Sequence, residues 1–463
     1  MKENVWNTYE EEDLKKIYQL GEDYKIFISN SKTEREVVEN SINIIKSYGF
    51  RDLREMIEEK KSLVPGDKIY VNNKEKSLAL FIIGEEDIEK GMNILGAHID
   101  SPRLDLKATP LYEDTSFAYF DTHYYGGIKK YQWVTLPLAL HGVVVKKDGT
   151  KVSINIGERE TDPVVGITDL LPHLGEKQMK KEASKVIEGE DLDILIGTRP
   201  LKKEEEGKEE DLVKNNILKL LKELYKIEEE DFLSAEIEVT PAGKAKDFGL
   251  DRSMVMAYGQ DDKVCAFTSL KAFLKVGQCK KTTSCILVDK EEIGSVGSTG
   301  MQSTFYENAI LEIASLLGKK ELTSLSRILS NSNMLSSDVN AAYDPLYSDV
   351  MDKRNASYFN NGVVFCKYTG SRGKYDSNDA NAEYIAKIRN VLDQNNVHFQ
   401  ISELGKVDIG GGGTIAYILA NKNVNVIDCG VGVLSMHAPW EVTSKSDIYE
   451  AYKCYKAFLK DMD

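Results

Sequence analysis

Two adjacent carboxylates, Glu291 and Glu292, stand where a predicted buried strand ends. The apolar run 284–288 precedes them, and the glycine-rich stretch 294–300 follows. Ligands of open α/β sheets bind outside the carboxyl ends of the strands. Neighbouring loop side chains point in different directions, so one Glu could bind a metal while the other faces a substrate. The alternative is a solvated acidic turn, which is the commoner setting for loop carboxylates.

Four more candidate ligands have comparable positions. His98 and His437 each follow an apolar run, Asp261 begins a predicted helix, and Asp338 follows a short apolar run. Taken singly, each has an ordinary structural alternative, namely a core histidine or a helix-capping aspartate. Together with Glu292 they form a set that zinc accepts, because zinc binds imidazole nitrogen and carboxylate oxygen.

The set divides over two metal ions. Two ions about 3.5–4 Å apart need a shared carboxylate and a few terminal ligands. The resulting assignment makes Asp261 the bridge, gives one ion His98 and Asp338, and gives the other Glu292 and His437. Three carboxylates then offset three of the four positive charges of two zinc ions, which leaves one for a bound hydroxide.

Two further carboxylates have predicted roles beside these ligands. Asp100 lies two residues past His98 and can reach back to orient its imidazole and raise its basicity. Glu291, next to the ligand Glu292, is placed to take a proton from metal-bound water as the general base.

Strands and helices on both sides of an insertion must position these residues. Before residue 105 the sequence predicts a helix from Thr33 through Ser47 and strands at 68–72, 77–84 and 93–97. From residue 246 onward strands and helices alternate, which predicts a mainly parallel sheet with helices on both faces. The elements expected there are helices at 261–276 and 446–462 and strands at 362–366 and 424–428.

The interval between them has a different pattern. Short segments with β character recur at 131–134, 142–145 and 152–156, followed by a charged interval, Lys202 to Asp211, that predicts a solvated loop. A helix at 212–227 and a strand at 235–240 follow. We therefore predict an α/β protein with a mainly parallel mixed sheet flanked by helices. Its catalytic domain, residues 1–104 and 246–463, is interrupted by an inserted β-rich domain, residues 105–245.

Composition excludes several classes of protein. The net charge of −15 argues against a nucleic-acid or anionic-membrane partner, since both reward clustered Lys and Arg. The six cysteines form no CxxC pair and lie mostly in apolar runs, which favours a reducing compartment. The amino terminus lacks the apolar core of a signal peptide, and no apolar run approaches the ~20 residues that span a bilayer. We expect a cytoplasmic protein.

The run Gly410–Thr414 lacks the Gly-Lys-Ser/Thr ending of a phosphate loop, which argues against nucleotide binding.

The sequence resembles the aspartyl aminopeptidase (aminopeptidase I) family of di-zinc exopeptidases. The matching motifs, in the family's order and spacing, are residues 96–102, Asp261-Asp262, residues 289–295, Ser337-Asp338 and residues 435–437. The resemblance implies an aminopeptidase with two zinc ions per subunit and the ligands and base assigned above. Manganese or cobalt are possible substitutes, because sites of this kind accept several divalent ions.

The resemblance also implies properties that the residues alone do not show. Family members form tetrahedral dodecamers built from dimers, with the inserted domain making the dimer contacts. His173 corresponds to a histidine that reaches a neighbouring subunit's active site. Lys367 corresponds to a lysine near the substrate side chain, and Gly411 belongs to a backbone element near the substrate amine. A plain loop histidine and a solvated strand-end lysine are the alternatives for His173 and Lys367.

Other functions stay open at this point. Within enzymes the alternative is a related di-zinc carboxypeptidase or deacylase, and outside them it is a scaffold with a dead site. The family name implies acidic N-terminal residues in the substrate. Residues 368–373, next to Lys367, depart from the acid-specific enzymes, so the preferred residue is open as well.

Overall fold

The computed structural model describes residues 3–202, 210–375 and 377–463. The chain contacts divide it into two compact units. The first comprises Met1–Asp100, Ala245–Met436 and Glu441–Asp463, and the second comprises Ser101–Lys244 and His437–Trp440. The second unit starts and ends within a few residues of the predicted insertion. It also takes in the short segment that carries His437, which the sequence did not place there.

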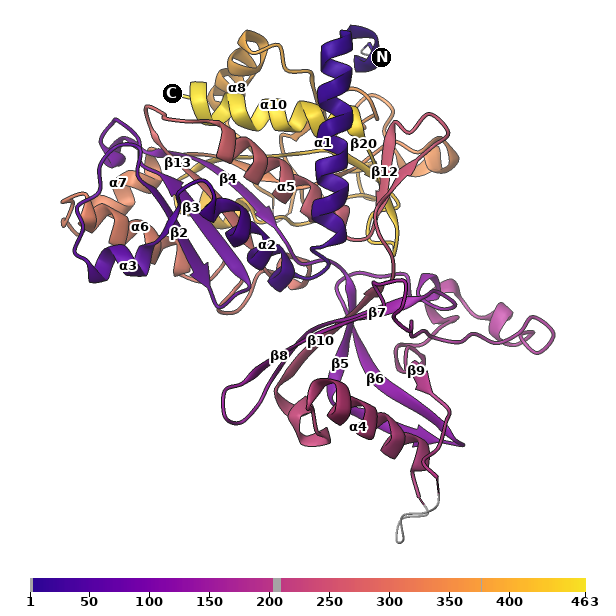
Figure 1. Ribbon diagram of the computed structural model, residues 1–463. Helices are drawn as coiled ribbons and strands as arrows, with labels where there is room; N and C mark the ends of the chain where they lie inside the picture. The colour runs from indigo at the N-terminus through magenta and orange to yellow at the C-terminus, as the bar shows by residue number, and fades with distance from the viewer. Residues whose placement is uncertain (1–2, 203–209, 376) are drawn as a thin grey trace. The chain divides into compact units, whose positions relative to one another are not determined.

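A mixed sheet, nine-stranded within the described residues, forms the centre of the first unit (Figure 1). In spatial order its strands are β1 (Arg51–Asp52), β2 (Lys68–Asn73), β3 (Ser77–Ile82), β13 (Thr282–Val288), β4 (Met92–His98), β14 (Asn333–Ser337), β18 (Asn425–Gly430), β16 (Val363–Cys366) and β17 (Phe399–Ser402). The central strands β13, β4, β14 and β18 are parallel, whereas β3 and β16 pair antiparallel at either side of them. The carboxyl ends of the four central strands therefore meet at one edge.

Helices cover both faces of this sheet. One hydrophobic core includes residues of α1 (Glu11–Ser29), α2 (Glu34–Lys46), α5 (Gln260–Lys275), α8 (Ala382–Gln394) and α10 (Lys445–Asp461). The other includes residues of α3 (Leu53–Glu58), α6 (Phe305–Leu316), α7 (Ser324–Ser330) and α9 (Ala416–Ala420). Alternate residues of β3 enter the two cores, Leu80 the first and Phe81 the second, which explains why the strand is apolar throughout. The predicted α/β class with a mixed sheet and flanking helices is confirmed.

A smaller sheet completes the first unit. Its described strands, in spatial order, are β11 (Lys246–Phe248), β12 (Met254–Ala257), β20 (Glu441–Ser444), β19 (Gly432–Leu434) and β15 (Asn340–Ala341). β12 leads directly into α5, and β15 lies just beyond Asp338. The small sheet therefore borders two of the segments that carry candidate ligands.

The second unit is built on an antiparallel sheet. Its strands, in spatial order within the described residues, are β8 (Lys151–Ile156), β7 (Leu138–Val145), β10 (Ala235–Pro241), β5 (Arg103–Asp114), β6 (Phe117–Tyr125) and β9 (Ile194–Gly197). Helix α4 (Leu212–Tyr225) packs on it, and the first backbone N–H groups of α4 donate to the Glu113 carboxylate of β5.

One predicted strand in this unit is wrong. Residues 131–134 have β character, but the chain there forms the short 3-10 helix η3 (Lys130–Gln132). The backbone N–H groups of Gln132 and Trp133 donate to Lys129 and Lys130, so this segment closes on itself as a turn, with Trp133 fully buried. Most of the charged interval 202–211, predicted to be a solvated loop, lies outside the described residues. No helix in the described part of the chain is long and apolar enough to cross a membrane.

Candidate metal centre

Five predicted site residues lie where the central strands of the large sheet end. His98 is the last residue of β4, and Asp338 directly follows β14. Glu291 and Glu292 form most of the short 3-10 helix η8 (Glu291–Ile293) that follows β13. Asp261 lies in the first turn of α5, after β12. Because β13, β4 and β14 are adjacent and parallel, the residues that follow these strands come to the same edge of the sheet. Asp261 follows β12 of the small sheet and reaches this edge, where its Oδ1 atom lies 3.0 Å from His98 Nε2.

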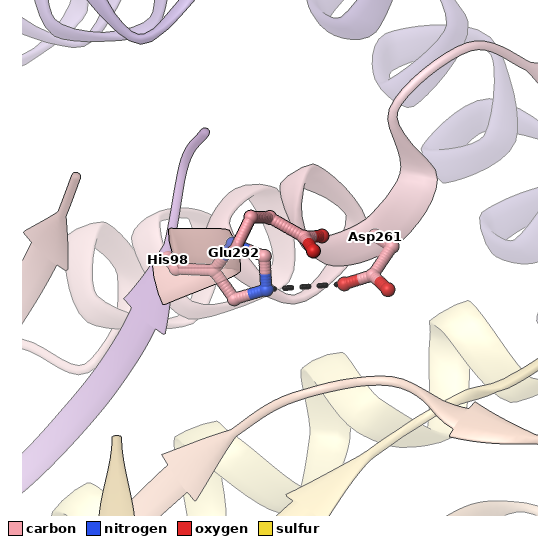
Figure 2. A group of neighbouring side chains, drawn as sticks. All are labelled: His98, Asp261 and Glu292. Atoms are coloured by element: carbon pink, nitrogen blue, oxygen red, sulfur yellow. Dashed lines mark hydrogen bonds and ion pairs between the residues drawn. The ribbon is translucent and has the colours of Figure 1, made fainter. Parts of the chain in front are cut away.

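The distances around His98 are those of a compact donor group. Its Nε2 atom lies 3.0 Å from Asp261 Oδ1, 3.9 Å from Asp338 Oδ1 and 3.9 Å from Glu291 Oε2. Figure 2 shows His98, Asp261 and Glu292 pointing toward one another, and one ligand atom from each of the three lies within 4.8 Å of the others. One imidazole nitrogen and several carboxylate oxygens at this spacing fit the ligand chemistry of zinc.

Asp262 is a member of the site that the sequence analysis did not propose as a ligand. With His98 and Asp338 it forms a second group whose ligand atoms lie within 4.8 Å of one another. The side chain is fully buried, and among the described residues neither carboxylate oxygen has a nitrogen or oxygen hydrogen-bond donor. A buried carboxylate in that position is costly unless a cation compensates it. The only signal in the sequence was its place in the Asp261-Asp262 pair.

Asp100 connects the imidazole to the loop that carries the two glutamates. The Nδ1 atom of His98 lies 3.1 Å from the backbone oxygen of Asp100 and 3.3 Å from its Oδ1. An N–H on Nδ1 would donate there and leave the Nε2 lone pair facing the carboxylates. The Asp100 carboxylate also accepts the backbone N–H groups of Glu291, at 3.1 Å, and Glu292, at 3.2 Å. One side chain therefore fixes both a candidate ligand and the adjoining loop.

Electrostatics at the centre favour a cation. Burial raises the pKa of Asp262 and of Asp338 well above the usual aspartate value, and nearby carboxylates add to the effect. Burial acts to lower the pKa of His98, but the Asp100 and Asp261 carboxylates outweigh it and raise the pKa well above its usual value. So many acidic groups around one imidazole are ionised together at low cost only when positive charge lies among them.

Two predicted residues belong to the second unit. His437 lies in the segment 437–440, and its Nδ1 atom is 2.9 Å from the backbone oxygen of Gly127. A hydrogen bond of this kind is the usual support of a metal-ligating histidine, whose other ring nitrogen binds the metal. His173 is exposed in the turn at residues 171–175.

Two predicted substrate-binding residues belong to the first unit. Lys367 directly follows β16, and its half-exposed ammonium group lies 3.2 Å from Asp379 Oδ1. Gly411 has φ 131°, and a Cβ there would lie 2.0 Å from the backbone oxygen of Gly370. Since the Gly370 N–H also donates to Gly412 at 2.8 Å, the glycine run packs backbone against backbone on the chain that follows Lys367.

Comparison with known proteins gives one family. The family model described as aminopeptidase I zinc metalloprotease (M18) matches residues 27–459. A probable M18 family aminopeptidase 1 from Clostridium acetobutylicum is 58% identical over 458 residues, covering 99% of this chain and 98% of its own. The crystal structure of aminopeptidase I from the same organism has a TM-score of 0.92 at 56% identity and covers 100% of both chains.

A second solved structure is as similar in fold. The M18 family aminopeptidase from Thermotoga maritima has a TM-score of 0.94 at 44% identity, and 99% of each chain is covered. Family, identity and coverage agree over nearly the whole length of the sequence. The chain belongs to the aminopeptidase I (M18) family of zinc metalloproteases and is a zinc aminopeptidase.

Proposed function

We propose that the protein removes N-terminal residues from peptides at a site for two zinc ions that share Asp261. The observation that carries the proposal is the convergence of His98, Asp261, Glu292 and Asp338 at the end of the parallel strands. His98 and Asp338 would hold one ion, and Glu292 with His437 the other. His437 enters the set from its place in the sequence and from the resemblance stated above.

Zinc at this centre would supply Lewis acidity, which lowers the pKa of a coordinated water and polarises the scissile carbonyl. Glu291 would be the general base that accepts the proton of the attacking water and delivers it to the leaving amine. Its carboxylate oxygen lies 3.9 Å from His98 Nε2, beside the ligands, and its backbone N–H is held by Asp100. Asp100 would keep the His98 imidazole in one orientation through the cycle.

Replacing Glu291 with Gln tests the base directly. Gln has nearly the same volume but cannot accept the proton, so turnover should fall by about 10²–10⁴-fold. Bound zinc, measured by metal analysis of the purified protein, should be unchanged because Glu291 is not among the assigned ligands. A fully active variant would show that the proton goes to another group. Loss of zinc would instead make Glu291 a ligand.

The substrate class follows from the free N-terminal amine that an aminopeptidase requires. We include in the proposal a preference for acidic N-terminal residues, with Lys367 as the cation that attracts the substrate carboxylate and Gly411 in the backbone that faces the substrate amine. A panel of amino-acid amides, assayed with zinc, manganese and cobalt in turn, tests the preference. N-acetylated peptides should resist cleavage, whereas a deacylase or carboxypeptidase would accept them.

We further propose that the first unit is the catalytic domain and the second a dimerisation domain of a cytoplasmic homo-oligomer, a tetrahedral dodecamer in which His173 reaches a neighbouring active site. Three leucines around His173 are 47–69% exposed: Leu170, Leu171 and Leu174. Apolar side chains gathered at one exposed turn are typical of a protein interface. The dodecamer structure of yeast aminopeptidase 1 shares the fold at 20% identity, with a TM-score of 0.75. Native mass measurement of the purified protein tests the assembly, and activity of a separated protomer would contradict the role of His173.

A further inference from the structure

The loop that carries Glu291 and Glu292 accepts hydrogen bonds from a turn more than 200 residues earlier in the chain. We call residues 289–300 the catalytic loop and Asn73–Ser77 the β2–β3 turn. Asn73 Nδ2 donates to the backbone oxygen of Ser298 at 2.8 Å, and the Ser77 hydroxyl donates to the backbone oxygen of Thr299. An isolated β-bridge between Asp289 and Gly300 joins the two ends of the catalytic loop. The turn therefore binds the catalytic loop near its carboxyl end, away from Glu291 and Glu292.

A lysine in the turn adds a charged connection to the other end of the loop. Lys76 Nζ lies 2.9 Å from Glu34 Oε1, in the first turn of α2, and 4.0 Å from Asp289 Oδ2. Asp289 Oδ2 also accepts the Thr299 hydroxyl at 2.6 Å. Glu34 and Asp289 are 0% and 1% exposed, and the Lys76 side chain is 14% exposed. One ammonium group thus lies between two buried carboxylates, and one of these begins the catalytic loop.

The contact between Lys76 and Asp289 matters because Asp289 is buried among other carboxylates. Burial, together with the Glu34 and Asp100 carboxylates, raises the pKa of Asp289 to about 7, although Lys76 acts to lower it. Asp100 supports the same loop on its other side, by accepting the backbone N–H groups of Glu291 and Glu292. Loss of the lysine would remove a positive charge that lies near both buried carboxylates, Glu34 and Asp289, and the loop could relieve their repulsion by moving away.

We propose that Lys76 is a positioning residue that, through Asp289, holds Glu291 and Glu292 in register with the metal centre. The inference rests on the proposed roles of these two glutamates. Lys76 touches neither substrate nor metal; it acts on the geometry of the loop. Misplacement of a reacting group by about 1 Å can cost as much as 10²-fold in rate, so a support behind the loop can matter as much as a residue in front of it.

The same turn supplies a matched control. Glu75, next to Lys76, pairs with Arg35 of α2 at 3.1 Å, and its side chain is 48% exposed. This outer pair links the turn to the same helix without reaching the catalytic loop. Glu75→Gln therefore removes the ion pair with Arg35 and leaves the contact of Lys76 with Asp289 in place. Lys76→Met removes the contacts of Lys76 with Glu34 and Asp289 instead.

Hydrogen exchange of the full-length protein, with zinc bound and after zinc removal, measures the loop itself. In Lys76→Met, backbone exchange in peptides covering residues 289–300 should be faster by at least about tenfold. A tenfold change is the size of effect expected from the loss of one charged contact. Zinc affinity, from competition with a chelator, should fall by about 10–100-fold. We expect kcat to fall by a similar factor and KM to stay within about twofold, since the loop positions reacting groups. Glu75→Gln should match the parent protein in all these measurements.

A double variant separates positioning from simple charge burial. Lys76→Met with Glu34→Gln removes both charges of the Lys76–Glu34 ion pair, so thermal stability should largely recover while exchange in residues 289–300 and zinc affinity stay at the single-variant values. Recovery of all three would overturn the proposal, because neutralising Glu34 would then be the whole role of Lys76. Unchanged exchange in Lys76→Met would overturn it as well. If the parent protein cleaved no peptide, the proposed function would fail, yet the exchange and zinc measurements would still decide the role of Lys76.

Discussion

Asp100→Ala removes one carboxylate that three groups of the metal centre share. Its oxygens accept the backbone N–H groups of Glu291 and Glu292 at 3.1 and 3.2 Å, and Oδ1 lies 3.3 Å from His98 Nδ1. Leaving a buried donor unsatisfied costs about 1–3 kcal/mol each. The two loop N–H groups lie in a partly buried region that water can enter, so the lower half of that range applies. We expect unfolding free energy to fall by about 2–4 kcal/mol.

The effect on zinc should be separate from the effect on stability. The His98 imidazole keeps the Asp100 backbone oxygen, at 3.1 Å, but loses the charged acceptor beside it. Removing such a support typically lowers metal affinity by about 10–100-fold. Zinc affinity is measured by competition with a chelator under conditions in which the variant is fully folded, and stability by denaturant unfolding of the zinc-stripped protein.

Asp87→Ala is the control for this experiment. Asp87 also accepts a backbone N–H, that of Glu89 at 3.0 Å, at the start of the 3-10 helix η2 (Ile88–Lys90). It caps a surface turn, so its loss should cost about 1 kcal/mol and leave zinc affinity unchanged. If Asp100→Ala matched Asp87→Ala in both measurements, the carboxylate would be an ordinary turn acceptor and the reasoning about the centre would be refuted.

Two further predictions concern Gly411 in the glycine run and Asp428 in β18. Gly411→Ala, whose Cβ would lie 2.0 Å from Gly370 O, should lower kcat/KM by about tenfold or more in steady-state kinetics. Gly413→Ala is the control: its Cβ would have nothing within 4 Å, so kcat/KM should stay within about twofold of the parent value. Equal effects of the two variants would show that the backbone contact of Gly411 does not matter for activity. Burial raises the pKa of Asp428 from 3.8 to about 7 although the Thr414 hydroxyl donates to it at 2.6 Å, so the folded state binds the proton more tightly. The free energy of unfolding should therefore fall as pH rises from about 4 to 7, by about 4 kcal/mol at most. Asp428→Asn should flatten this part of the curve of unfolding free energy against pH. The same slope in the variant and the parent protein would contradict this role of Asp428.

The positions of the site residues were largely predictable because they depend on local patterns. The apolar runs of β4 and β13 end in His98 and just before Glu291, and an apolar run that stops at polar residues marks the end of a buried strand. The order of the strands depends on contacts far apart in sequence. That β3 and β16 are antiparallel neighbours of the central strands therefore appeared only in the structure.

Other features had too weak a local signal to be assigned. Asp262 follows a predicted ligand, and sequence does not show which of two adjacent carboxylates turns inward. Lys76 looks like a charged turn residue, and its contact with Asp289 comes from the pairing of β3 with β13. The wrongly predicted strand at 131–134 has aromatic and β-branched residues that favour strands, but such preferences decide a structure only where a neighbouring strand is available to pair.

The central claim is that Asp261 bridges two zinc ions held by residues from distant parts of the chain. X-ray diffraction from crystals of the zinc-loaded protein, collected on both sides of the zinc absorption edge, tests it most directly. We predict two anomalous peaks about 3.5–4 Å apart, with one Asp261 oxygen on each and His98 and His437 on different ions. A single peak, or two peaks that Asp261 does not join, would contradict the account.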